Sequence, residues 1–314
     1  MKISVVMATY NGEQYIAEQL ESILGQTRPV DEVIIHDDCS TDGTAGIVED
    51  FLMRHHPDGD WRFSVNRENL GYGTNFAQAL FEASGDLICF CDQDDVWMPD
   101  RILEMEKMMK AHPEVLLAGS EFEPFSCTDD APEIPEWELA SFKGDDSLEH
   151  LLFVPENVFI GCQGCTMILR KSFLDRIRDW WYPGWAHDEY VWKLALCMDG
   201  LYFWHHPTLR RRLHSSNVTL HREHDVQKRL KYLEELKKSH EQTCRFGQQI
   251  GLDRKKLELM EKEIRAASMR IELIRNGRLW LGIPLLFYGK YYHRKRSMPV
   301  EMLMAIRNRK GDKA

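Results

Sequence analysis

Residues 86–100 read DLICFCDQDDVWMPD, an apolar run followed by three nearly adjacent aspartates. The apolar run is typical of a buried strand, and Asp92, Asp94 and Asp95 stand where that strand ends. Carboxylates this close repel one another, so the cluster needs a positive partner. The D-x-D spacing suits a hard divalent cation such as Mg²⁺ or Mn²⁺, which prefers oxygen ligands. Capping of the next helix by Asp94 or Asp95 is the alternative.

Strand-like and helix-like segments alternate on both sides of this stretch. Further compact apolar runs, typical of strands, lie at residues 3–8, 32–36 and 61–65. Segments with helical spacing of apolar residues lie at 13–27, 42–56, 76–84 and 99–112. The alternation predicts βαβ units and therefore an α/β fold, with a Rossmann-like, mostly parallel sheet flanked by helices.

Polar side chains follow three of the predicted strands. They are Thr9-Tyr10-Asn11, Asp37-Asp38 and the cluster from Asp92 to Asp95. Ligands of parallel sheets bind beyond the carboxyl ends of the strands, so these clusters predict a binding site at one edge of the sheet. The stretch NLGYGTN, residues 69–75, predicts a glycine-rich turn near that edge, because glycine permits a close backbone approach.

The remainder of the chain divides into two regions. Residues from about 121 to 158 are acidic and contain several prolines, which predicts a loop region, and GCTMILRKSF then returns to a strand and a helix. A loop leads into a helix that starts near Asp188. From residue 222 glycine and proline become scarce and helical periodicity dominates. We therefore expect an α/β domain over residues 1–221, with halves at about 1–120 and 121–221, and a helical region over residues 222–314.

Composition narrows the functional class. The chain has 314 residues and a formal net charge of −10, and 43% of its residues are hydrophobic. An acidic chain of this kind is not expected to bind nucleic acid, and it has enough apolar residues for a sizeable core. The spacing of Cys162 and Cys165 is only weak evidence for a zinc or redox site. The short apolar N-terminal run and the lack of an 18-residue apolar window predict a cytoplasmic protein.

The order and spacing of several motifs resemble a known family. SVVMATYNGEQYIAEQLESILGQT, DDCSTDGT, NLGYGTN and DQDDVWMPDR are followed by GCTMILRK, HDEYVW and RLHSSNV. Together they resemble the inverting family-2 glycosyltransferases of the GT-A fold, over roughly residues 1–220. The combination of motifs resembles the rhamnosyltransferase-like branch that builds bacterial surface polysaccharides. The resemblance implies transfer from a nucleotide-sugar donor, dTDP-rhamnose or a UDP-hexose, to a saccharide or lipid-linked acceptor, with Mn²⁺ or Mg²⁺ as cofactor.

The resemblance also implies roles for individual residues. Asp94 and His214 would ligate the metal, and Asp92 would contact the metal or the ribose. Some of the implied roles have an alternative. Tyr10 could instead lie in the core, and the stretch 69–75 could be a plain turn. His214 could be a loop residue that hydrogen-bonds to the backbone. The nucleotide and donor would be bound by Thr9, Tyr10, Asn11, Glu13, Asp38, Asn69, Gly71, Asn75, Asp92, Gln93 and Arg212.

The resemblance assigns the general base to Asp188. A base must take a proton from the acceptor hydroxyl as the sugar bond forms, and a helix N-terminus favours an ionised carboxylate. Glu189 is the neighbouring competitor for this role. Many relatives carry Glu-Asp where this chain has His187-Asp188. Gly164 and Cys165, small residues that leave room for a sugar, would line the acceptor side together with His187 and Glu189.

The C-terminal segment differs in character from the rest. Residues 270–314 hold 11 Lys and Arg and 3 Asp and Glu, and the stretch LWLGIPLLFYGKYYHRKRS mixes aromatic, aliphatic and basic residues. Such a segment suits peripheral contact with the inner face of an anionic membrane. A helix that docks on the catalytic domain and a dimer contact are the alternatives.

Two other functions fit the sequence less well. A non-catalytic scaffold that binds sugar nucleotides on the same fold would tolerate loss of some site residues, yet Asp92, Asp94, Asp188 and His214 are all present. A nucleotide-dependent dehydrogenase is disfavoured because TYNGEQ, and no G-x-G-x-x-G, follows the first strand.

Overall fold

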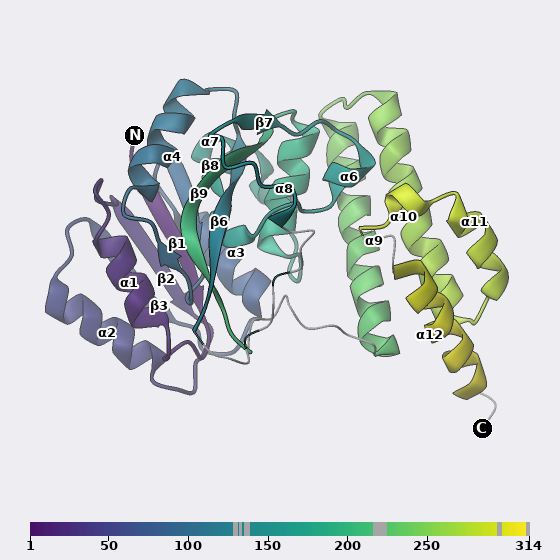
Figure 1. Cartoon of the computed structure of the whole chain (residues 1–314), viewed down its shortest axis with the longest axis horizontal. Coiled ribbons are helices and arrows are strands. Elements are labelled where there is room, and N and C mark those ends of the chain that lie inside the picture. The colour runs from purple at the N-terminus through teal and green to yellow at the C-terminus, as the bar shows by residue number, and fades with distance from the viewer. Residues whose placement is uncertain (128–130, 132–133, 135–138, 216–224, 294–296, 312–314) are drawn as a thin grey trace. The chain divides into compact units, whose positions relative to one another are not determined.

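The computed structural model describes residues 1–127, 131, 134, 139–215, 225–293 and 297–311. For residues 309–311 it describes the backbone alone. The chain divides into two compact units (Figure 1). The first unit comprises Met1–Leu151 and Gly161–Leu220, and the second comprises Leu152–Ile160 and His221–Ala314. Residues 152–160, expected within the α/β region, therefore pack with the helical unit.

The strands of the first unit form one sheet of nine strands in the described part of the chain. The order is β3-β2-β1-β4-β8-β6-β9-β5, and β7 pairs with β9. The strands are β1 (Ile3–Thr9), β2 (Glu32–Asp37), β3 (Asp60–Val65), β4 (Leu87–Cys91), β5 (Val96–Trp97), β6 (Leu117–Ser126), β7 (Leu148–His150), β8 (Ile168–Arg170) and β9 (Leu201–Leu213). Strands β1 to β4 pair in parallel, as do β6 and β9, and the other pairs are antiparallel.

The helices follow the pattern expected of βαβ units in the first unit and pack with one another in the second. The α-helices are α1 (Ile16–Leu24), α2 (Thr44–His55), α3 (Tyr72–Glu82), α4 (Arg101–Ala111), α6 (Pro155–Val158), α7 (Lys171–Ile177), α8 (His187–Cys197), α9 (Val226–Gln249), α10 (Arg254–Arg275), α11 (Gly282–Leu286) and α12 (Ser297–Gly311). Short 3₁₀ turns are η1 (Gly164–Thr166), η2 (Arg178–Trp180), η4 (Leu279–Leu281) and η5 (Gly289–Tyr291). The predicted helix start near Asp188 is confirmed by α8.

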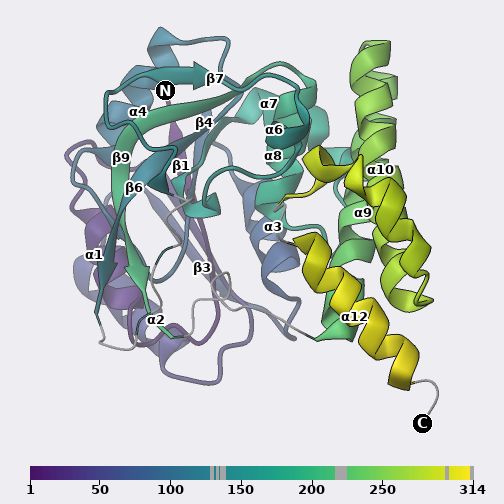
Figure 2. The same cartoon turned by 45° about the vertical axis from the view of Figure 1, so that its right-hand side comes forward.

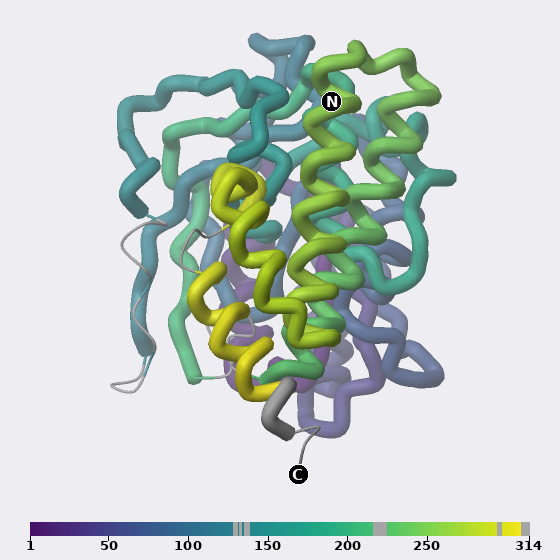
Figure 3. The backbone as a smooth tube through the Cα atoms, turned by 90° about the vertical axis from the view of Figure 1, so that its right-hand side faces the viewer, coloured from purple at the N-terminus to yellow at the C-terminus, as the bar shows by residue number. Residues whose placement is uncertain are grey.

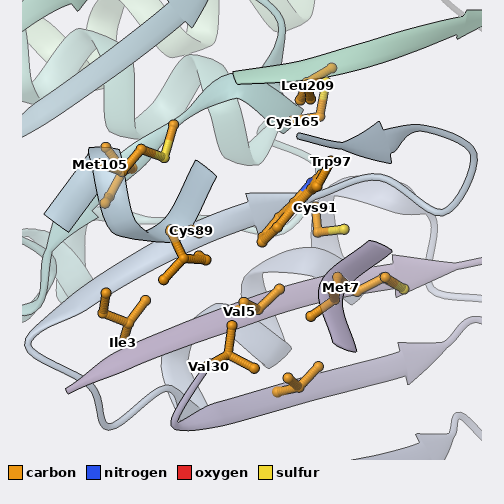
Figure 4. Close-up of a cluster of buried hydrophobic side chains, with 14 of the residues drawn as sticks. Ile3, Val5, Met7, Val30, Cys89, Cys91, Trp97, Met105, Cys165 and Leu209 are labelled. Carbon is orange, nitrogen blue, oxygen red and sulfur yellow. The ribbon is translucent and has the colours of Figure 1, made fainter. Parts of the chain in front are cut away.

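The parallel strands β1, β2 and β4 are buried on both faces, which explains their largely apolar sequences, whereas the edge strand β3 is mostly exposed. On one face Val5 and Cys89 belong to the same buried cluster as Met105 of α4 (Figure 4). On the other face Phe90 packs on Phe76 of α3, with ring centroids 4.8 Å apart. Figure 2 shows the sheet between these two helical layers. Because helices cover both faces of the sheet, ligands can reach it only at the strand ends, where the loops meet.

One prediction about the first unit is wrong. Residues 121–126 were expected in a loop because they are acidic and contain a proline, but they extend β6 alongside β9. The pairing has register shifts around Glu121. Glu121 is buried and accepts a hydrogen bond from the backbone N–H of Lys143 at 2.6 Å. The strand is thus held by partners far away in sequence, which a local pattern does not reveal.

The second unit is built on the helix pair α9 and α10 (Figure 3). Each helix begins at an aspartate that caps it: Asp225 accepts from the N–H of Lys228, and Asp253 from the N–H of Lys256. Leucine and isoleucine side chains of both helices form the buried seam between them. None of the described helices combines the length and apolar character that crossing a membrane requires.

A buried carboxylate holds the last helix in this unit. Glu301 of α12 is fully buried and accepts hydrogen bonds from Arg229 of α9 and Arg270 of α10, at 2.6 and 2.7 Å. The Arg270 guanidinium also lies 4.2 Å from the centre of the Tyr292 ring. Removal of one partner from a buried ion pair typically costs about 3–5 kcal/mol, so this contact fixes α12 to both long helices.

Candidate functional site

The carboxyl ends of β1, β2 and β4 meet at one edge of the sheet, as predicted. Asp37 accepts hydrogen bonds there from the Thr9 hydroxyl at 2.7 Å and from the backbone N–H of Ser40 at 2.7 Å. Thr9 and Asp37 are both buried. These two residues therefore join the ends of β1 and β2 and shape the loops that follow.

The loop after β1 is fastened to its neighbours on both sides. The Gln93 amide accepts from the Tyr10 N–H at 2.9 Å and donates to the Tyr10 carbonyl at 3.0 Å. Asn11 has a positive φ of 48°, and its side chain accepts from the Thr41 N–H at 2.8 Å. Glu13 accepts from the Gly43 N–H at 2.6 Å. The Tyr10 side chain is exposed at the site edge, so the alternative of a core aromatic is wrong.

Asp38 organises the loop after β3. Its buried carboxylate accepts from the backbone N–H groups of Leu70 and Gly71 at 2.7 and 2.8 Å and from the Asn66 amide at 3.0 Å. Asn69 donates to the Asp38 carbonyl at 3.1 Å. Asp38 thus already serves three donors of this loop. Since a carboxylate offers about four acceptor positions, one position is left for a further donor.

Helix α3 begins at Tyr72, within the stretch 69–75 where a turn was expected and before the expected helix start at residue 76. Asn75 therefore lies inside the helix, where its buried amide donates to the His36 carbonyl at 2.8 Å. Gly71, with a φ of 79°, is the residue that makes the turn. Gly73 brings α3 against the loop before α8, because a Cβ there would lie 2.7 Å from the Trp185 carbonyl oxygen.

Asp94 and His214 come together across the site. His214 Nε2 lies 2.8 Å from Asp94 Oδ2, and the His214 ring packs on Tyr15 with centroids 4.6 Å apart. Arg212 Nε donates to the Asp94 carbonyl at 2.8 Å, and its guanidinium is paired with Glu18 of α1. Arg212, predicted to bind the nucleotide donor, thus holds the aspartate loop in this structure.

A different trio of potential ligand atoms also gathers in the described residues. Oxygens of Asp92 and Asp95 and the sulfur of Cys165 lie within 4.8 Å of one another. Burial followed by the charges of Asp95 and Asp92 raises the pKa of the Cys165 thiol well above its ordinary value, so the sulfur keeps its proton. A protonated thiol is a poor ligand for Mg²⁺ or Mn²⁺. Cys165, predicted to line the acceptor side, is buried, with its sulfur close to Asp92 and Asp95.

By ligand chemistry, the donor set of Asp94, His214 and Asp92 suits Mn²⁺ better than this trio. Two carboxylates and an imidazole offer hard oxygen atoms and one nitrogen, which suit a manganese ion. Desolvation among surrounding atoms and repulsion by Asp94 and Asp95 raise the pKa of Asp92, even though its side chain reaches the surface. A bound cation would relieve this repulsion.

Part of the positive charge that the aspartates need comes from the chain itself. Arg101 of α4 is buried and donates to the Thr208 hydroxyl and the Cys165 carbonyl, both at 2.7 Å. Arg211 of β9 is buried as well, and its charge acts on Asp95. Burial and the Asp94 charge nevertheless raise the pKa of Asp95 to about 7. The sequence motif contains Arg101, but only its long-range hydrogen bonds identify it as a support of the site.

Asp188 and His187 open helix α8 beside Gly164. A Cβ on Gly164 would lie 3.4 Å from Asp188 Oδ2 and 3.5 Å from His187 Nε2. Asp188 Oδ1 accepts from the N–H of Glu189 at 2.7 Å. The His187 ring stacks on Phe76 at 3.7 Å, and burial lowers its pKa although Asp188 opposes this. His187 is therefore a neutral ring at the wall of the site.

Glu189 is engaged elsewhere. One of its oxygens pairs with the fully buried Lys193, and the other accepts from the Trp185 indole N–H at 3.2 Å. The two carboxylates at the start of α8 thus differ, because Glu189 is bound to a cation and Asp188 is not bound to one in the contacts described above. Sequence reasoning could not separate them by geometry, since Lys193 lies one helical turn further on and carries no motif.

The sheet order, with polar loops at the ends of β1, β2 and β4 and the mixed strands β6 to β9 beyond them, defines an α/β protein of the GT-A fold. A family model described as glycosyl transferase family 2 matches residues 4–176, more than half of the chain. The chain therefore belongs to glycosyl transferase family 2, which confirms the resemblance seen in the motifs.

Curated relatives match over shorter stretches. The chain is 42% identical over 99 residues to the dTDP-rhamnosyl transferase RfbG of Shigella flexneri, which is 31% of this chain and 34% of that protein. It is 37% identical over 111 residues to the putative teichuronic acid biosynthesis glycosyltransferase TuaG of Bacillus subtilis, 34% of this chain and 42% of that protein. The matches span less than half the length of these relatives.

Solved structures resemble the chain over nearly its whole length. TarS 1-349 of S. aureus in complex with UDP-GlcNAc has a TM-score of 0.64 at 17% identity, covering 99% of this chain and 92% of that one. The mannosyltransferase PcManGT from Pyrobaculum calidifontis, in complex with GDP-Man and Mn²⁺, has a TM-score of 0.57 at 19% identity, covering 98% and 86%. At these identities the likeness shows the fold.

Proposed function

We propose that the protein is an inverting glycosyltransferase of bacterial surface polysaccharide synthesis. It would move a sugar from a nucleoside diphosphate donor, dTDP-rhamnose or a UDP-hexose, to a hydroxyl of a saccharide or lipid-linked acceptor. The observation that carries the proposal is the position of Asp188 at the start of α8, beside Gly164 and within electrostatic reach of Asp92. Family membership, the RfbG match and the sugar-nucleotide complexes of the structural neighbours support it.

Asp188 acts as the general base in this mechanism. The acceptor oxygen attacks the anomeric carbon from the face opposite the diphosphate, and its proton passes to Asp188. The new carbon–oxygen bond forms as the bond to the diphosphate breaks, so the configuration at the anomeric carbon inverts. Glu189 is unsuited to the role because it is paired with Lys193. The small Gly164 leaves room for the acceptor next to Asp188.

Asp94, His214 and Asp92 are the residues that would hold Mn²⁺ or Mg²⁺. When bound, the cation neutralises charge on the departing diphosphate. Arg212, with its contacts to the backbone of Asp94 and to Glu18, keeps the aspartate loop in place. Thr9, Tyr10, Asn11 and the Asp38 loop would border the nucleotide, since they lie at the same edge of the sheet.

The proposal is tested first by thermal shift with a donor panel, with and without MnCl₂. We expect stabilisation by one donor in the presence of Mn²⁺, and its loss in Asp94→Asn, which also reports metal binding without an activity assay. If no donor stabilises the protein with either metal, the enzyme proposal fails.

Turnover is tested with Asp188→Asn and the matched variant Glu189→Gln. Loss of a general base typically costs 10²- to 10⁴-fold, so we expect Asp188→Asn to lower kcat by about that factor with donor binding retained. Glu189→Gln should lower kcat far less than Asp188→Asn does. Proton NMR of the product linkage should show an anomeric configuration opposite to that of the donor. Donor binding without turnover, with Asp188→Asn indistinguishable from wild type, would instead indicate a scaffold.

A further inference from the structure

An outward apolar face lies between α10 and α12 in the second unit. Trp280, Ile283, Leu286 and Phe287 have side chains that are 64%, 67%, 67% and 81% exposed. Trp280 lies in η4, Ile283 and Leu286 lie in α11, and Phe287 directly follows α11. Their spacing of three to four residues places them on one side of this short helical segment. Isolated exposed apolar residues are common, but four large ones within eight positions form a patch.

The opposite side of the same segment is part of the core. Leu281 and Leu285 are buried with Leu273 of α10 and Ala305 of α12 in one apolar cluster. The segment is therefore apolar on both sides, whereas a helix that only covers a core has a polar outer face. Because the inner side fixes its orientation, the exposed side chains are held in place rather than left on a loose loop.

The stretch of sequence that carries the patch has charges of one sign. Residues 276–300 contain five Lys and Arg and no Asp or Glu. Among the described ones, Arg278 and Lys290 are exposed and flank the patch in sequence, and Arg278 is paired with Glu272 at 2.8 Å. Residues 270–314 carry +8 (11 minus 3), so the remainder of the chain carries −18 (−10 minus +8). The excess of basic residues thus falls in the same stretch of sequence as the exposed apolar side chains.

We propose that this face, Trp280, Ile283, Leu286 and Phe287 with Arg278 and Lys290, docks the protein on an anionic lipid surface. Large aromatic and aliphatic side chains enter the boundary between headgroups and acyl chains, and nearby basic groups are attracted to anionic headgroups. A second copy of the chain fits less well, because a symmetric contact would place two basic patches against each other. The contact is interfacial, since the segment is far too short to span a bilayer.

The test uses the full chain and vesicles of phosphatidylcholine alone or mixed with phosphatidylglycerol. We expect co-sedimentation with the anionic vesicles at low salt, weaker binding to neutral vesicles and weaker binding as salt rises. The double variant Ile283→Ser/Phe287→Ser should lower the partition coefficient by at least about tenfold, because it removes apolar side chains from the interface. Lys290→Gln should lower it about fivefold, the effect of one basic group near an anionic surface.

Met53→Ser is the matched control. Met53 is 63% exposed on α2 of the first unit, so its replacement removes a comparable exposed apolar side chain elsewhere. We expect this variant to bind vesicles as the wild type does, and all variants to retain the wild-type melting temperature because the substituted side chains are exposed.

Three results would overturn the inference. The first is no sedimentation of the wild type with anionic vesicles at low salt, and the second is equal binding by the double variant. The third is a lipid-free dimer, seen by sedimentation velocity, that the double variant abolishes while vesicles bind nothing. The outcome does not depend on sugar transfer: vesicle binding by a protein without transferase activity would leave this inference standing and remove only the proposed function.

Discussion

Replacement of Glu32 by glutamine should make the first unit less stable at neutral pH. Glu32 begins β2 and is 1% exposed. Its carboxylate accepts from the Ser84 N–H and hydroxyl at 2.8 and 2.7 Å, from the Ser4 hydroxyl, and from Arg62 at 2.7 Å. Burial opposes ionisation, but the hydrogen bonds from Ser4 and Ser84 outweigh it and lower the pKa of Glu32 to about 2. The ionised carboxylate therefore ties β2 to β1 and to the residues before β4.

The size and the sign of the effect follow from that pKa. The ordinary value is 4.5, so the difference of about 2.5 pH units, at 1.36 kcal/mol each, corresponds to about 3 kcal/mol of stability. Because the pKa is lower in the folded protein, this contribution is complete above pH 4.5 and is lost as the pH falls toward 2. At pH 3 about 2 kcal/mol of it should be gone, since the unfolded chain already binds the proton there.

Urea unfolding of wild type and Glu32→Gln at a series of pH values measures the stability that the Glu32 carboxylate contributes at each pH. Eight of the nine tryptophans belong to the first unit, so tryptophan fluorescence reports mainly on that unit. The free-energy difference between the two proteins should be about 3 kcal/mol at pH 7 and shrink to about 1 kcal/mol at pH 3. A difference that is constant with pH would refute the reasoning, because it would assign the loss to packing and not to the carboxylate charge.

Two glycine substitutions probe the site itself. Gly73→Ala should lower kcat about tenfold or more and lower Tm, because its Cβ would lie 2.7 Å from the Trp185 carbonyl and push the loop before α8 that positions the base; Gly46→Ala, in open space on α2, should leave kcat unchanged and raise Tm slightly. Gly12→Ala should weaken donor binding several-fold with little change in Tm, since its Cβ would displace the Gln93 amide. Gln93→Ala should weaken donor binding to the same extent. Full donor affinity in either variant would argue against a role of Gln93 in donor binding.

The sequence was most informative where local pattern and fold agree. Apolar runs and glycines located β1 to β4 and the helices up to α4. The signal was clearest for β1, β2 and β4, because parallel strands buried on both faces have continuous apolar sequences. The same rule failed at β6, where Glu121 is buried by virtue of distant partners. An acidic segment with a proline offers no local sign that it pairs with a strand some eighty residues later.

The site residues show the same difference between what local sequence patterns predict and what only the tertiary contacts determine. The motifs predicted that Asp94 and His214 share one site, and the two side chains lie 2.8 Å apart. They did not reveal that Asp38 already serves three donors or that Arg101 lies buried below the aspartates, because these contacts depend on how loops from different strands meet. Residue identity predicted where charge gathers, and the tertiary contacts determined which groups neutralise it.

The burial of Glu301 has a consequence for how this protein can change over time. The carboxylate anchors α12 to α9 and α10, and these contacts do not involve the outward side chains of the segment between α10 and α12. Substitutions on the outward face of that segment therefore carry little penalty in folding. A lineage can exchange Trp280 or Phe287 for polar or bulkier residues, and so gain, lose or retarget an attachment surface, while the rest of the helical unit and the catalytic unit keep their sequences.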